Sequence, residues 1–351
     1  MLKALQAGRA LAAISVTAFH LSIAMGLARY GGNAAFSDYT SMGHHGVDFF
    51  FVLSGFIILF AHVDDIGRPE CWRDYFLKRF VRLFPIYWLY SLPFVLLLLL
   101  GFGTDAKLPT EPLDWLTNLT LIRFNNALPI LPPSWTLFHE IGFYAVFSLL
   151  IVRRSLGIAA FVVFIAGCLI HYNYPGPDDR TPLNVYTASY NLYFLFGMGA
   201  YWLYAKGGKG IAELLLGLVL FSYSVWGERL PYHLTPLLLA CSFALLLAAV
   251  AKLEQSGRLH VPGILLHIGN ASYTIYLIHE ALEGLLLKMV IRSGIYGAIG
   301  AHASYLLVLA GVIALGCLAY LLVERPVLNF LRRRLLAGRN KARAAALAPS
   351  G

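Results

Sequence analysis

The feature that most constrains this chain is a series of apolar runs of about 20 residues that recurs along the sequence. A helix of that length crosses a hydrocarbon layer of about 30 Å, whereas the strands of a membrane barrel would alternate apolar and polar residues. Hydrophobic residues make up 59% of the chain and charged residues 13%, against roughly 45–50% and 25% in soluble domains. The sequence therefore predicts an all-α, polytopic integral membrane helical bundle.

About ten transmembrane spans are expected, with the N-terminus and the C-terminus both cytoplasmic. They are placed at about 8–28, 45–62, 79–101, 134–152, 156–171, 185–204, 210–226, 232–251, 264–287 and 303–323. When the basic residues are assigned to alternating sides of these spans, 20 of the 27 fall on the side of the N-terminus. This asymmetry follows the positive-inside rule and accounts for the net charge of +9 without a nucleic-acid partner.

The chain is expected to form one transmembrane domain, residues 1–330, followed by a basic tail, residues 331–351. The tail is predicted to be disordered in the cytoplasm and to touch anionic lipid. The first apolar run follows a short basic leader but lacks a convincing cleavage site, so it is predicted to be a retained helix. The four cysteines are scattered singly, which indicates neither a disulfide framework nor a cysteine metal site.

Ionisable side chains inside the predicted spans are candidate functional residues, since a charge near the bilayer centre costs at least about 2.5–3.5 kcal/mol. Arg9 and His20 lie eleven residues apart, which on a helix places them on one face with a rise of about 16 Å. Arg9 is then at the cytoplasmic boundary and His20 near mid-membrane. Each also has an ordinary explanation, as a boundary arginine and as a packing histidine.

Two further ionisable residues come out at a depth similar to that of His20. Glu140 follows His139 near the outer end of the fourth span, and His279 lies about 22 Å along the ninth span, beside Glu280. We expect His20, Glu140 and His279 to meet. A hydrogen bond between Glu140 and His20 would stabilise the protonated imidazole, although the same contact could instead only hold helices together.

A basic cluster, Lys78, Arg79 and Arg82, lies at the inner end of the third span. The positive-inside bias explains such a cluster without a ligand, but arginines also bind phosphate well. A ligand that joins this cluster to His20 needs phosphates at one end and a reactive atom about 16 Å away. Coenzyme A has this form, so acyl-CoA is the expected donor, with its phosphates against Arg9, Arg79 and Arg82.

Six stretches resemble, in this order, the acyltransferase 3 family, the membrane O-acyltransferases that modify bacterial saccharides. They are GRALAAISVTAFH with its R-x(10)-H spacing, HGVDFFFVLSGFII at 45–58, RFVRLFPIYW at 79–88, WTLFHEIGFY at 135–144, SYTIYLIH at 272–279 and VERPVLNF at 323–330. The resemblance covers roughly residues 5–330. The stretch that begins at Trp135 is most similar to the exopolysaccharide branch of the family.

The resemblance implies a site residue by residue. Its motifs assign catalysis to His20 and Glu140, make Arg9 the motif partner of His20, and match Arg79 and Arg82 to the pair that binds acyl-CoA. Many members have a second glutamate where this chain has Ile141, so only Glu140 can take that role. Supporting roles for the substrates are expected at Asp48, Trp135, Tyr273 and His279.

The reaction needs a hydrogen-bond donor to its oxyanion, and the candidates are Tyr273, Tyr276, Ser54 and backbone amides. His44, His45 and Asp48 have the residue types of a metal site, but at that spacing on a helix they converge poorly. No metal cofactor is expected.

The implied reaction transfers an acyl group, acetyl by default, from cytosolic acyl-CoA to a saccharide hydroxyl. His20 would act as general base, and a transient acyl-histidine stays open. The expected partners are the acceptor saccharide, the lipid bilayer of the bacterial inner membrane and polysaccharide assembly machinery. Two other hypotheses are a proton-coupled transporter, with His20, Glu140 and His279 as a proton relay, and an inert component of an assembly complex.

Overall fold

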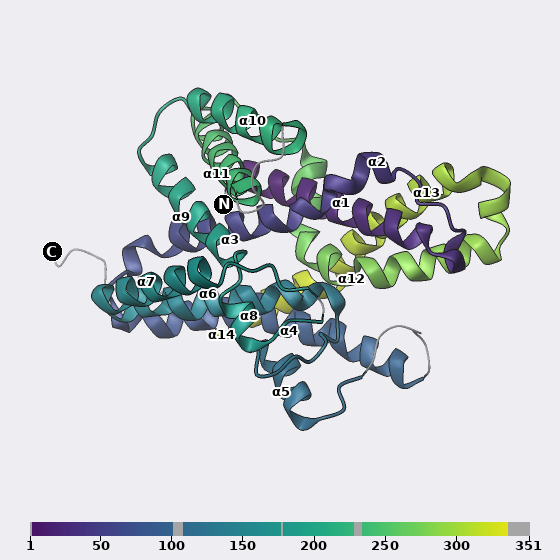
Figure 1. Ribbon diagram of the computed structural model, residues 1–351, viewed down its shortest axis with the longest axis horizontal. Helices are drawn as coiled ribbons and strands as arrows, with labels where there is room; N and C mark the ends of the chain where they lie inside the picture. Colours follow the sequence, from purple (N-terminus) through teal and green to yellow (C-terminus); the bar gives the residue numbers. More distant parts are fainter. Residues whose placement is uncertain (1, 101–107, 177, 228–233, 336–351) are drawn as a thin grey trace.

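The computed structural model describes residues 2–100, 108–176, 178–227 and 234–335. Within these ranges the chain is helical and contains no strand, apart from an isolated bridge between Asn173 and Ala188. The predicted all-α class is confirmed for the described part of the chain. Figure 1 shows the helices as one bundle, with the α10–α11 hairpin and the α12–α13 hairpin projecting in different directions.

Each predicted span overlaps one of ten helices, although the span at 185–204 begins before α9, and residues 101 and 232–233 of two other spans lie outside the described residues. These helices are α1 (Lys3–Gly26), α3 (Gly46–His62), α4 (Trp72–Leu99), α6 (Trp135–Val152), α7 (Arg154–His171), α9 (Asn191–Ala205), α10 (Ile211–Trp226), α11 (Leu234–Gln255), α12 (Gly263–Arg292) and α13 (Ile295–Ala319). Among the described residues, seven segments are long and apolar enough to cross a bilayer. The chain is thus a multi-pass membrane protein, while the count of ten spans and the cytoplasmic termini stay predictions.

The remaining helical segments are short, apart from the last. They are short 3-10 turns at Ala28–Tyr30, Ser41–His45, Val63–Asp65, Pro69–Cys71 and Pro132–Ser134, together with α2 (Ser37–Thr40), α5 (Pro112–Thr120), α8 (Pro182–Tyr186), the π-helical turn Tyr320–Glu324 and α14 (Arg325–Leu335). The first five residues of the predicted tail, 331–335, continue α14, and residues 336–351 lie outside the described residues.

Helix α4 begins seven residues before the predicted start of the third span, at Trp72. A hydropathy pattern starts a span where charged residues stop, but the helix itself continues through them. Arg79 and Arg82 therefore lie about two and about three turns beyond the first residue of α4. Both arginines are partly buried in the bundle, and their predicted position at the inner end of the span stays a prediction.

Two close helix contacts hold the central part of the bundle. Helix α1 lies along α12, and α3 lies along α9 (Figure 1). A Cβ atom at Gly269 of α12 would lie 2.0 Å from the backbone oxygen of Gln6, and one at Gly197 of α9 would lie 1.8 Å from that of Val52. Only glycine permits these backbones to approach so closely.

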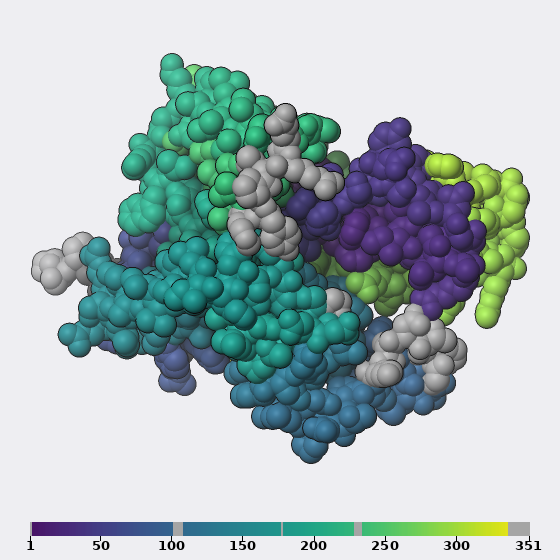
Figure 2. Space-filling model, in the orientation of Figure 1, coloured from purple at the N-terminus to yellow at the C-terminus, as the bar shows by residue number. Residues whose placement is uncertain are grey.

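The space-filling view (Figure 2) shows where the main groups of helices lie. In Figure 2 the α10–α11 hairpin forms one lobe at the upper left, and α1 with α13 forms another at the right. The segment that contains α5 covers the lower edge of the same face. The polar residues of interest come from α1, α3, α4, α6 and α12, whose packing therefore decides the geometry of the site.

Candidate active site

Two neighbouring cavities contain the predicted site residues. The arginine cavity has about 790 Å³ of empty space, and its polar lining is Arg9, Ser54, Arg79, Arg82, Thr136, Glu140, Tyr144, Ser272, Tyr273 and Tyr276. The histidine cavity has about 610 Å³ and is lined by Phe19, His20, His44, Val47, Asp48, Pro133, Trp135, Tyr190, Tyr276, His279 and Glu280. Val47 and Tyr276 line both cavities, so these two side chains lie where the cavities meet.

The arginine cavity brings three guanidinium groups together from two helices. Arg9 of α1 donates from Nε to the Ser272 hydroxyl at 2.9 Å, which fixes it against α12. Arg82 of α4 lies over the ring of Tyr273 and 4.0 Å from a carboxylate oxygen of Glu324. Three positive groups face one lining carboxylate, that of Glu140, so the cavity suits a ligand with several negative charges.

Arg79 of α4 completes this group of guanidiniums. It lies over the ring of Tyr144, at 5.8 Å from the ring centre. This cation–π contact holds the guanidinium without neutralising it, because an aromatic ring carries no net charge. Arg79 therefore keeps its charge available to a ligand in the arginine cavity.

Glu140 lies among these arginines and does not contact His20. Its carboxylate accepts a hydrogen bond from the Ser54 hydroxyl at 2.9 Å and another from the Tyr144 hydroxyl. The predicted hydrogen bond between Glu140 and His20 is wrong. Counting residues along a helix gives depth but not direction, and α6 presents Glu140 to Ser54 of α3 and to the arginine cavity rather than to His20.

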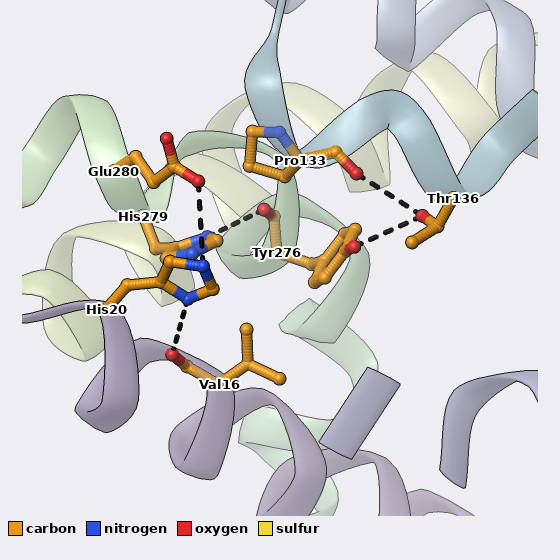
Figure 3. A network of polar contacts seen from close by, with 7 residues as sticks. All are labelled: Val16, His20, Pro133, Thr136, Tyr276, His279 and Glu280. Atoms are coloured by element: carbon orange, nitrogen blue, oxygen red, sulfur yellow. Dashed lines mark hydrogen bonds and ion pairs between the residues drawn. The ribbon is translucent and has the colours of Figure 1, made fainter. Parts of the chain in front are cut away.

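His20 instead meets α12, the helix that runs along α1 (Figure 3). Its Nδ1 lies 2.9 Å from the backbone oxygen of Val16, and its Nε2 lies 3.9 Å from a carboxylate oxygen of Glu280. The ring of His279 lies 5.0 Å from that of His20, centre to centre. The predicted meeting of His20 with His279 is confirmed, and Glu280 takes the place that was predicted for Glu140.

The tautomer of His20 follows from its backbone contact. A carbonyl oxygen only accepts hydrogen bonds, so Nδ1 of His20 carries the proton and donates to Val16. In the neutral ring the lone pair is then on Nε2, which faces Glu280. The side chain of His20 is 32% exposed, so this lone pair belongs to a group that a substrate in the histidine cavity can reach.

The four supporting residues divide between the two cavities. Tyr273 lines the arginine cavity and donates its hydroxyl to the backbone oxygen of Leu83 at 3.0 Å. Asp48, Trp135 and His279 line the histidine cavity, where Asp48 accepts a hydrogen bond from His45 at 2.6 Å. Their substrate roles stay predictions.

Two arginines in the loops that follow α5 and α7 pack against aromatic rings near the histidine cavity. The Arg180 guanidinium lies 4.7 Å from the ring centre of Trp135, and that of Arg123 lies 4.1 Å from the ring centre of Phe138. Burial, together with the nearby positive charge of Arg180, lowers the pKa of Arg123 to about 10. Both arginines therefore stay charged at neutral pH and make cation–π contacts.

Sequence reasoning missed Glu280, Tyr144 and Ser272 as residues of the site. The signal for Glu280 was present, since it directly follows His279 on the same helix and lies at the same depth. Tyr144 and Ser272 are uncharged, so nothing in the sequence distinguishes them from other polar residues in a helix. His139, beside Glu140, is buried, contacts Asn191 of α9 and packs behind Trp135 and Tyr190, but it lines neither cavity itself.

Comparison with known proteins assigns the family. The acyltransferase domain model of the acyltransferase 3 family matches residues 2–321. "Exopolysaccharide production protein ExoZ" of Rhizobium meliloti (strain 1021) is 33% identical over 84% of this chain and 95% of its own length. "Acyltransferase MdmB" of Streptomyces mycarofaciens is 28% identical over 92% of this chain and 90% of its own length.

No solved structure matches the chain. The family model nevertheless covers far more than half of the sequence, including both cavities. The chain therefore belongs to the acyltransferase 3 family and is a multi-pass membrane O-acyltransferase.

Proposed function

We propose that the chain transfers an acyl group, acetyl by default, from acyl-CoA to a hydroxyl of a saccharide at the bacterial inner membrane. The observation that carries the proposal is the pair of adjoining cavities, one rich in arginine and one that contains His20, which share Tyr276. A bisubstrate reaction needs this arrangement, because the donor and the acceptor must enter separately and meet at one point. The relative named for exopolysaccharide production supports a saccharide acceptor.

The donor would occupy the arginine cavity. The phosphates of acyl-CoA would pair with Arg9, Arg79 and Arg82, while the acyl thioester points toward Tyr276. The hydroxyl of Tyr276 shares a hydrogen bond with that of Thr136 at 3.1 Å, and its ring lies where the two cavities meet, so this side chain would have to turn before the thioester reaches His20.

The acceptor hydroxyl would enter the histidine cavity. The lone pair on Nε2 of His20 takes the hydroxyl proton while the oxygen attacks the thioester carbonyl carbon. The carbon–sulfur bond then breaks, and the thiolate that leaves takes the proton from His20 to form the coenzyme A thiol. The ester and the thiol account for every atom of both substrates, and no metal is required.

The test uses the purified protein in lipid nanodiscs with acetyl-CoA and a surface polysaccharide of the producing strain from which alkali has removed the esters. We expect one new ester for each thiol released. Transport of a solute without thiol release would instead favour the proton-coupled transporter.

Delivery of the acceptor by polysaccharide assembly machinery is part of the proposal, and co-purification of the chain with such proteins would support it.

The donor site has its own test. Arg79→Ala and Arg9→Ala should each weaken the binding of acetyl-CoA by about ten- to a hundredfold, because each removes a charge-assisted hydrogen bond to phosphate. Lys78→Ala is the matched control, since Lys78 is the basic neighbour of Arg79 on α4 but does not line the cavity. Equal affinities for all three variants would show that the phosphates bind elsewhere.

A further inference from the structure

Glu280 is an ionisable residue whose carboxylate accepts no hydrogen bond from the described part of the chain. Within the described ranges its only polar contact is with Nε2 of His20, at 3.9 Å, which is beyond hydrogen-bond distance. Glu140, at the other cavity, accepts hydrogen bonds from two hydroxyls. The side chain of Glu280 is 35% exposed, and it lines the histidine cavity. Whatever fills that cavity, water or a ligand, therefore supplies the hydrogen-bond donors that a carboxylate needs.

The histidines of this cavity also present acceptors. In His20, His44 and His279, Nδ1 lies 2.9, 2.6 and 2.8 Å from the backbone oxygens of Val16, Ser41 and Tyr276. Each Nδ1 therefore carries the proton, and each neutral ring keeps its lone pair on Nε2. The Nε2 atom of His279 is buried, so the acceptors that face a ligand are Nε2 of His20, Nε2 of His44 and the Glu280 carboxylate. These acceptors suit a ligand that brings several donors.

We propose that the histidine cavity binds the acceptor sugar through two neighbouring free hydroxyl groups. One gives its proton to Nε2 of His20 and becomes acylated, and the other donates a hydrogen bond to the Glu280 carboxylate. The 3.9 Å between the two acceptor atoms suits hydroxyls on adjacent carbons of one ring. This inference rests on the proposed function, because it assumes that the histidine cavity is the acceptor site.

The rest of the lining favours a neutral sugar. The cavity contains no lysine or arginine, and Asp48 and Glu280 would repel a carboxylate or phosphate on the acceptor. Trp135 and Tyr190 offer aromatic surface for the apolar face of a sugar ring, and Arg180 covers the ring of Trp135. The acceptor is thus inferred to be an uncharged sugar residue with a vicinal diol.

A first experiment locates the product. The wild-type protein in nanodiscs acylates the alkali-treated polysaccharide with acetyl-CoA, and nuclear magnetic resonance assigns the new ester. We expect an ester on an uncharged residue, next to a free hydroxyl. Periodate oxidation followed by borohydride reduction, which opens vicinal diols, should abolish acceptor activity. An ester on a hydroxyl without a free neighbour, or on a charged sugar, would overturn the inference while leaving the proposed function intact. No transfer by the wild type would overturn both.

A second experiment tests Glu280 itself. Glu280→Ala should raise the KM for the polysaccharide by about ten- to a hundredfold, the usual value of a hydrogen bond to a charged group, and leave the KM for acetyl-CoA unchanged. Glu280→Gln keeps a carbonyl oxygen in the same place and should recover most of the affinity. Glu283→Gln is the control, since Glu283 lies one turn further on α12 and lines neither cavity.

The variants also separate this role from an indirect one. If Glu280 acted only through its charge on His20, alanine and glutamine would lower kcat alike and leave the KM for the polysaccharide unchanged. That pattern would overturn the inference.

Discussion

The two cavities of this protein differ in the hydrogen-bonding character of the groups that face them. In the arginine cavity three guanidinium groups, which only donate, outnumber the Glu140 carboxylate, whereas the charged groups of the histidine cavity are carboxylates, which accept, beside imidazoles. The first suits the phosphates of a nucleotide cofactor, and the second suits the hydroxyls of a sugar. One helix bundle thus holds two chemically different cavities that meet at Val47 and Tyr276.

The carboxylates show the same difference. The Glu140 carboxylate accepts hydrogen bonds from Ser54 and Tyr144 and lies beside the arginines, so its contacts are with the protein itself. Glu280 has no such partners within the described residues and faces the cavity. Depth in the membrane alone does not separate these roles, since both residues lie well inside their helices.

The largest effect is expected at His20. His20→Ala should lower acyl transfer by about 10²- to 10⁴-fold, the usual contribution of a general base, and leave the affinity for acetyl-CoA within twofold of the wild type. Rates of thiol release and binding isotherms measure the two quantities. A matching loss of acetyl-CoA affinity would show that the cavities do not act separately.

A smaller effect, on stability, is expected at Glu140. Glu140→Ala leaves two hydroxyls without their acceptor and leaves Glu324 as the remaining carboxylate beside the arginines, so it should cost about 1–3 kcal/mol. Because the phosphates of acetyl-CoA would replace the lost charge, the ligand should raise the melting temperature of this variant more than that of the wild type. An unchanged melting temperature, or equal ligand shifts, would argue against Glu140 as a part of the donor site.

Tyr276, which lies where the two cavities meet, gives a third prediction. Tyr276→Ala should join the cavities and allow water to reach the bound thioester, so that hydrolysis of acetyl-CoA without acceptor rises severalfold. Tyr276→Phe keeps the ring and should hydrolyse acetyl-CoA at the wild-type rate. The measurement is thiol release in the absence of polysaccharide, and equal rates for all three proteins would mean that Tyr276 is no barrier.

The smallest effect concerns metal. Atoms of His20, His279 and Glu280 lie within 4.8 Å of one another, a set of ligand types that also suits zinc. A bound ion would occupy the lone pair that His20 needs as a base, so we expect chelators to leave the rate of acyl transfer unchanged. Loss of activity on chelation, with recovery on addition of zinc, would replace the general-base mechanism by a metal-assisted one.

Much of the fold was predictable because a bilayer restricts which secondary structures can cross it. Apolar runs of fixed length can become only spanning helices, and each predicted span overlaps a helix. The helix ends were less predictable: α4 starts at Trp72, and α9 starts at Asn191 rather than at 185. Hydropathy marks the apolar part of a helix, whereas its ends depend on hydrogen bonds and local turns.

The site was predictable to the extent that it lies along single helices. The spacing of Arg9 and His20 on α1 placed one residue at each cavity, and the spacing of Arg79 and Arg82 placed both at the same one. The partner of His20 was not predictable in this way. Glu140 and Glu280 have similar depths, and only the packing of α12 against α1, allowed by Gly269, brings Glu280 to the histidine.

The sequence by itself determined the class of protein, the helices and the depth of each ionisable residue, because these follow from local hydropathy and from the constant rise of a helix. The tertiary structure decided which of those residues face each other. The rotation of each helix about its axis, and which helices pack against it, depend on close contacts between distant segments. Only the packed bundle therefore divides the polar residues between a cavity rich in arginine and a cavity lined by histidines and carboxylates.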